Sequence, residues 1–96
     1  MDKEERRSEH RDRFSGDGFF IQDSALWELK FLDGTSDGVG AFCNREFKPG
    51  VQGLVSGKLP NSDELENIPS EVRWCARDSG AKDPFYPYRI GLRFLD

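Results

Sequence analysis

Four arginines near the N-terminus are the residues best suited to bind an anion. Residues 6–13 read Arg-Arg-Ser-Glu-His-Arg-Asp-Arg, so four arginines stand beside two acidic residues in a chain whose formal net charge is −4. The planar guanidinium group pairs through two hydrogen bonds with phosphate or carboxylate oxygens. Because the rest of the chain is acidic, this basic segment suits one small anion better than a polyanion such as DNA or RNA.

A second set of polar residues lies in a turn between two apolar segments. Asp33, Thr35 and Gly38 have the spacing Asp-x-Thr-x-x-Gly. The Asp33 carboxylate would accept hydrogen bonds from N–H groups of a ligand, and the Thr35 hydroxyl would bind a phosphate or a base. Gly38 would let the backbone approach closely. Asp and Thr are also typical of ordinary turns, so this motif alone does not establish a site.

The chain offers little for catalysis or for metal binding. Its two cysteines, Cys43 and Cys75, and its single histidine, His10, show no metal-ligand spacing. We expect both cysteines to pack as small apolar side chains, with one disulfide between them as the alternative. The sequence has no nucleophile–base pair and no glycine-rich phosphate loop before a helix. It therefore predicts a binding domain rather than an enzyme, with no metal and no cofactor.

Length and composition predict one small domain with an N-terminal arm. The 96 residues include eight Phe, two Trp and two Tyr, an aromatic content that argues against disorder. Residues 1–13 hold no apolar side chain except Met1, so we expect a flexible arm there and a folded domain over residues 14–96. No segment is long and apolar enough to span a membrane, and the polar start does not resemble a signal peptide. A cytoplasmic domain is predicted.

Six short strands are predicted, and they favour a closed antiparallel β-barrel. Residues 60–71 read instead as a loop with at most one helical turn, capped by Ser62. Alternation after this loop places Trp74 on the same face as Val72. Packing in the core is the commoner role for such a tryptophan, and a stacking platform is the alternative. The predicted strands cover residues 19–21, 26–32, 39–42, 51–59, 72–77 and 88–94.

Three motifs in this order resemble the PilZ domain family over nearly the whole chain, from about residue 5 to residue 95. They are Arg7-x-x-x-Arg11, the turn that runs from Asp33 to Gly38, and an ending that consists of Val-Arg-Trp at residues 72–74 and Tyr-Arg-Ile-Gly-Leu-Arg-Phe at residues 88–94. The family consists of bacterial receptors for the second messenger cyclic di-GMP, built on a six-stranded β-barrel. Thr35 stands where the family has serine, and it keeps the hydroxyl group. Many members end with a helix packed on the barrel, which we expect to be absent or truncated here.

The resemblance implies a site for cyclic di-GMP between the arm and the turn. Two arginines of the arm would pair with guanine O6 and N7 and with phosphate oxygens. Asp33 would accept from the N1–H and N2–H₂ donors of guanine. A guanine also needs a stacking surface, which Arg6, Arg11 or Trp74 would supply. The expected ligand-binding residues are Arg6, Arg7, Arg11, Asp33, Thr35, Gly38 and Trp74.

On this hypothesis, the domain is a monomer or weak dimer whose arm becomes ordered when the dinucleotide binds. A downstream protein or a fused domain would then detect the ordered arm. Arg6, directly before the first motif, favours a stacked pair of ligand molecules in this family. The alternative is a PilZ-like protein-interaction module that does not bind nucleotide. A single-stranded nucleic-acid binder on a similar barrel is disfavoured by the net charge of −4.

Overall fold

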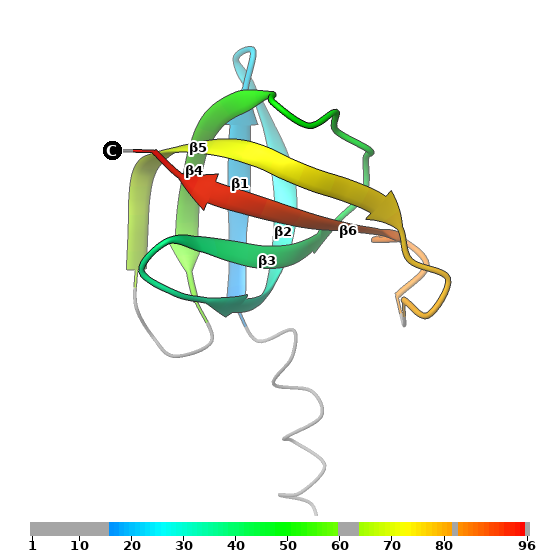
Figure 1. Cartoon of the computed structure of the whole chain (residues 1–96). Coiled ribbons are helices and arrows are strands. Elements are labelled where there is room, and N and C mark those ends of the chain that lie inside the picture. Colours follow the sequence, from blue (N-terminus) through cyan, green and yellow to red (C-terminus); the bar gives the residue numbers. More distant parts are fainter. Residues whose placement is uncertain (1–15, 60–63, 82, 96) are drawn as a thin grey trace, which may run out of the picture.

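The chain folds into a closed barrel of six antiparallel strands (Figure 1), as the sequence predicted. A computed structural model describes residues 16–59, 64–81 and 83–95. The barrel order is β1-β2-β3-β6-β5-β4, and the described residues include no helix. Nor does this part of the chain hold a helix that would cross a membrane. The strands are β1 (Gly16–Gln22), β2 (Ala25–Gly34), β3 (Gly38–Cys43), β4 (Gln52–Lys58), β5 (Glu64–Arg77) and β6 (Tyr88–Phe94).

The interior of the barrel is filled by the apolar residues that alternate along the strands. In β2, Leu29 and Phe31 are fully buried while Lys30 between them faces outward. Phe47, in the connection from β3 to β4, is buried in the core and meets Phe20 edge to face, with ring centroids 5.2 Å apart. The buried core cluster consists of Phe20, Leu29, Phe31, Val39, Ala41, Cys43, Phe47, Val55, Leu59, Val72, Ile90 and Leu92.

The barrel closes where β1 pairs with β4, and glycines make that closure possible. A Cβ at Gly18 would strike the Ser56 carbonyl oxygen and the Phe31 ring, and one at Gly57 would strike Gly18 itself. Gly57 also has a φ of 141°, a backbone conformation that side chains disfavour. The two strands therefore approach more closely than any larger residue would allow.

The loop expected over residues 60–71 is wrong from residue 64 onward, because β5 begins at Glu64. The first half of β5 pairs with β4 and the second half with β6, so one long bent strand joins two sides of the barrel. Pro69 is tolerated in it because the N–H and C=O of a strand residue point to the same side. The Pro69 carbonyl accepts a hydrogen bond from the N–H of Leu95, just past the end of β6. The N–H that proline lacks would point to that same side, where the pairing of β5 with β6 ends, so no hydrogen bond within the two strands is lost. The helical turn at Ser62 lies outside the described residues.

Both cysteines pack in or against the core and are free thiols, as the favoured prediction held. Cys43 lies on β3 and Cys75 on β5, with β6 between them. Their thiols lie near each other, because Cys75 Sγ is 3.9 Å from the same Arg45 carbonyl that Cys43 contacts, but both are free. The Cys43 thiol donates to the Arg45 carbonyl at 3.1 Å. Burial raises the pKa of Cys43 from 9.0 to about 12.

Gly57→Ala should lower the free energy of unfolding by about 2–4 kcal/mol, because it adds backbone strain and forces β1 and β4 apart. Urea denaturation of the purified chain measures this. Gly80→Ala is the matched control, since a Cβ there would meet only Asp78 Oδ1 at 3.4 Å, an ordinary contact. Equal stabilities for the two variants would show that the closure does not depend on glycine.

The raised pKa of Cys43 predicts a loss of stability in alkali. Below pH 9 the thiol stays protonated in both states, whereas between the ordinary value of 9.0 and the folded value of about 12 only the unfolded chain loses the proton. From about pH 9 to about pH 10 the wild type should lose about 1 kcal/mol more than Cys43→Ala. Urea titrations at both pH values provide the comparison, and parallel losses in the two proteins would contradict it.

Candidate functional site

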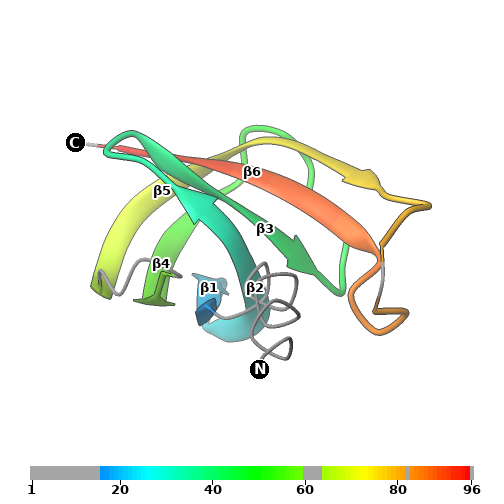
Figure 2. The same cartoon turned by 90° about the horizontal axis from the view of Figure 1, so that it is seen from below.

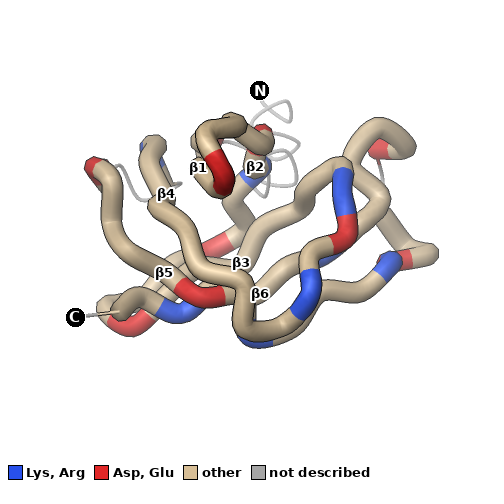
Figure 3. The backbone as a smooth tube through the Cα atoms, turned by 90° about the horizontal axis from the view of Figure 1, so that it is seen from above, with Lys and Arg blue, Asp and Glu red and all other residues tan. Residues whose placement is uncertain are grey.

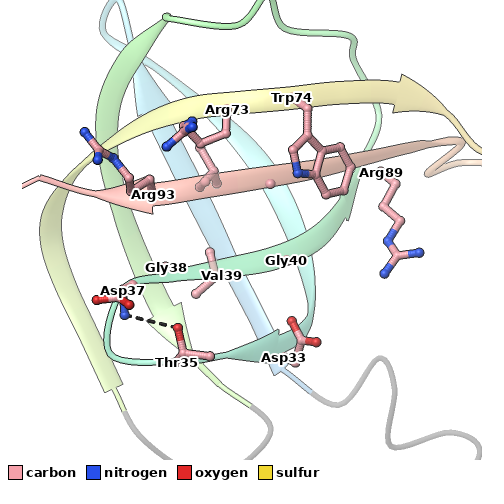
Figure 4. Close-up of a pocket in the computed structure, with 12 residues that line it drawn as sticks. Asp33, Thr35, Asp37, Gly38, Val39, Gly40, Arg73, Trp74, Arg89 and Arg93 are labelled. Atoms are coloured by element: carbon pink, nitrogen blue, oxygen red, sulfur yellow. Dashed lines mark hydrogen bonds between the residues drawn. The ribbon is translucent and has the colours of Figure 1, made fainter.

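A pocket of about 410 Å³ lies on the outside of the barrel, over β3, β6 and the second half of β5 (Figure 4). These strands stand in front of β1 and β2 in Figure 1, and Figure 2 shows β1 across the barrel from β6. The turn from β2 to β3 forms one edge of the pocket, and β5 forms the other. The lining consists of Asp33, Thr35, Asp37, Gly38, Val39, Gly40, Arg73, Trp74, Arg89, Gly91, Leu92 and Arg93.

The middle of the pocket is a single row of cross-strand neighbours on four strands. Asp33 of β2 pairs with Gly40 of β3, Gly40 with Gly91 of β6, and Gly91 with Trp74 of β5. A Cβ at Gly91 would collide with the Trp74 indole, so the indole lies against the bare backbone of β6. At Gly40 a Cβ would come within 2.9 Å of Asp33 Oδ1. The row therefore has a glycine floor with a carboxylate at one end and an indole at the other.

Two β-bulges turn the ends of this row outward. In β2 the register slips between Phe31 and Asp33, so Asp33 pairs with the outer residue Gly40 although it lies two positions after a core residue. In β5 the slip falls between Val72 and Trp74. The expectation that Trp74 shares the face of Val72 is wrong for this reason. The Trp74 side chain is 46% exposed, whereas Val72 is buried.

The turn between β2 and β3 is held by its own hydrogen bonds. Thr35 N–H donates to the Gly38 carbonyl at 2.9 Å, and Asp37 N–H donates to Thr35 Oγ1 at 3.1 Å. The Thr35 hydroxyl thus has one lone pair occupied and keeps its own hydrogen to donate. At Gly38 a Cβ would strike the Leu92 carbonyl oxygen, so this glycine serves the close approach of β3 to β6. The two hydrogen bonds and the close approach at Gly38 therefore fix the shape of the turn and its position against β6.

Three arginines of β5 and β6 supply positive charge around the row. Arg73, Arg89 and Arg93 all line the pocket, against the carboxylates of Asp33 and Asp37. Arg93 lies 3.8 Å from Glu71, and in the described part of the chain no ion pair involves the other two. Figure 3 shows basic positions along β5 and β6. The pocket can therefore accept an anion without first breaking a strong internal ion pair.

Four of the predicted site residues meet in this one pocket, although Trp74 is far from the turn in sequence. Asp33, Thr35 and Gly38 come from the turn, and Trp74 comes from β5. The predicted arginines 6, 7 and 11, and the expected flexible arm over residues 1–13, lie outside the described residues.

Sequence reasoning did not include the arginines of β5 and β6 in the site. The alternation of β6 gave a partial signal, because Arg89 and Arg93 stand opposite the buried Ile90 and Leu92. This alternation did not show that β3 and β5 are the neighbours of β6. No residue pattern around Arg73 predicts the bulge at that position. Among the residues that the structure describes, no group of three or more His, Cys, Asp or Glu side chains is placed to hold a metal ion.

Comparison with protein families finds a match. The family model described as PilZ domain matches residues 5–96 of the chain. No curated protein and no solved structure matches.

Gly91→Ala should displace the Trp74 indole from the floor of the pocket, because the new methyl group occupies the space of the ring. The expected result is a shifted indole N–H resonance of Trp74 and a more accessible ring in acrylamide quenching, while the Trp27 resonance stays in place. Gly40→Ala is the control, since the added Cβ meets only Asp33 Oδ1 and Cγ. An unchanged Trp74 resonance in Gly91→Ala would contradict this account of how the ring is positioned.

Proposed function

Because the chain belongs to the PilZ domain family, whose members are generally cyclic di-GMP receptors, we propose that it binds this dinucleotide in the pocket over β3, β6 and β5. The observation that carries the proposal is the row from Asp33 to Trp74 across the glycine floor. It offers bare backbone on which a planar nucleobase could lie, with the Asp33 carboxylate as a hydrogen-bond acceptor at one end. A protein-interaction module without a ligand would not need this arrangement.

Guanine recognition would come from Asp33. Its carboxylate accepts hydrogen bonds from both N1–H and N2–H₂, whereas adenine does not present that pair of donors on one edge. Bare backbone at Gly40 leaves room for the base beside this carboxylate. The exposed indole of Trp74 at the other end of the row supplies an aromatic surface for the second base or for the ribose side of the ligand.

The two phosphates would be bound by arginines and by the turn. Arg7 and Arg11 of the first motif would bind them from the N-terminal arm, and Arg73 and Arg89 line the pocket itself. The Thr35 hydroxyl would donate its hydrogen to a phosphate oxygen, because its own oxygen already accepts from the N–H of Asp37. Binding would hold the arm over the barrel, and this ordering is the change that a downstream protein or a fused domain would detect.

Calorimetric titration with cyclic di-GMP tests the proposal, with cyclic di-AMP and GTP as controls. The wild type should bind only cyclic di-GMP tightly. Arg7→Ala and Asp33→Asn should each weaken binding by roughly 10- to 150-fold, about 1.5–3 kcal/mol, because each removes a charge-assisted contact. Amide exchange over residues 5–13 should slow when the ligand is present.

Asp23→Asn is the matched control for charge. It makes the same change in the turn between β1 and β2, where a φ of 56° suits asparagine. Its affinity should equal that of the wild type. Wild-type affinity in folded Arg7→Ala and Asp33→Asn would overturn the receptor proposal in favour of an interaction module. Equal exchange with and without ligand would overturn only the ordering of the arm.

A further inference from the structure

A row of apolar side chains crosses the outside of the barrel on the side away from the pocket. Ile21 of β1 pairs with Leu26 of β2 and with Leu54 of β4, and Leu54 pairs with Pro69 of β5. Paired residues project to the same face of a sheet. Phe19, two positions before Ile21, projects to that face as well. We call Phe19, Ile21, Leu26, Leu54 and Pro69 the apolar face.

The apolar face points to solvent and not to the core. Its neighbours along the strands, Phe20 and Val55, are fully buried and fill the interior, so the alternate residues must lie outside. Phe19 is 42% exposed and Leu26 is 60% exposed. In Figures 2 and 3, β1 lies across the barrel from β6, which places this face opposite the pocket.

The fold gives no reason for apolar residues at these outer positions. The outer positions of an antiparallel barrel are ordinarily polar, since one side of each strand faces water. The barrel is closed, so these side chains protect no free sheet edge. Single exposed apolar residues are common, but a contiguous set on four neighbouring strands is typical of an interaction surface.

The charges around the apolar face restrict what can bind there. Lys30 is already paired with Asp17 at 3.1 Å and with Glu28 at 3.5 Å. The carboxylates on the strands and the turn that carry the face form what we call its acidic border, and a second copy of the chain would bring the same border and be repelled. The strands and turn that carry the face, outside the pocket lining, hold the carboxylates Asp17, Asp23, Glu28, Glu64, Glu66 and Glu71 against the basic residues Lys30, Lys58 and Arg77. Carboxylates are therefore in excess, although Glu71 also lies 3.8 Å from Arg93.

We propose that the apolar face binds an apolar segment of another protein whose flanking residues are lysines or arginines. Apolar side chains of the segment would cover Leu26, Ile21 and Leu54, and its basic residues would meet the acidic border. The location separates this surface from the pocket, so a ligand and a partner can be bound at the same time. The proposal does not depend on which ligand the pocket takes.

Fluorescence anisotropy with a labelled amphipathic peptide of leucine and lysine tests this on the full chain. A peptide with glutamate in place of lysine is the charge control. The wild type should bind the lysine peptide at least about tenfold more tightly than the glutamate peptide. Phe19→Thr and Leu26→Thr should each weaken binding of the lysine peptide by about tenfold, and threonine keeps the strand propensity of these positions.

Phe85→Ser is the matched variant, because Phe85 is 78% exposed but lies in the connection from β5 to β6. It should bind the lysine peptide like the wild type, as should Asp33→Asn. Circular dichroism and urea denaturation establish that each variant is folded. Equal losses in Leu26→Thr and Phe85→Ser would overturn the proposal, and so would equal binding of the two peptides. A dimer in sedimentation that Leu26→Thr abolishes would assign the face to a second copy instead.

Discussion

In a closed barrel, the side chain of each strand residue points either into the small core or out to solvent. The pocket exists because this alternation is interrupted at two places. Leu32 is the extra, unpaired residue at the bulge in β2, and Arg73 is the extra, unpaired residue at the bulge in β5. Each interruption turns one polar or aromatic side chain, Asp33 or Trp74, onto the outside next to β3 and β6. Without both, the carboxylate and the indole would not share a surface.

Glycines have two separate uses in this barrel. Gly18 and Gly57 let β1 and β4 approach closely enough for the sheet to close. Gly40 and Gly91 instead remove side chains from the outer surface, so that Asp33 and Trp74 lie along bare backbone. The first use gives the domain its shape. The second leaves a flat floor between two groups of different chemistry, which is what a nucleobase requires.

Two strands contribute to both functional surfaces that we infer. The first half of β5 carries Pro69 on the apolar face, and its second half carries Trp74 in the pocket. In the same way, β2 carries Leu26 on the apolar face near its start and Asp33 in the pocket near its end. The pocket side has arginines on β5 and β6, whereas the opposite side has an excess of carboxylates. A ligand in the pocket would therefore contact positive charge, whereas a protein partner on the apolar face would contact negative charge.

The sequence alone determined the all-β fold, the number of strands and the turn that carries Asp33 and Thr35. These follow from local signals, namely alternation and turn residues, together with the resemblance carried by the motifs. Only the tertiary structure decided that β5 starts at Glu64 and that Trp74 faces outward, and only it gathered Arg73 and Arg89 around the glycine floor. The reason is physical: a bulge or a strand neighbour depends on how distant segments pair, and no local pattern of apolar residues encodes that pairing.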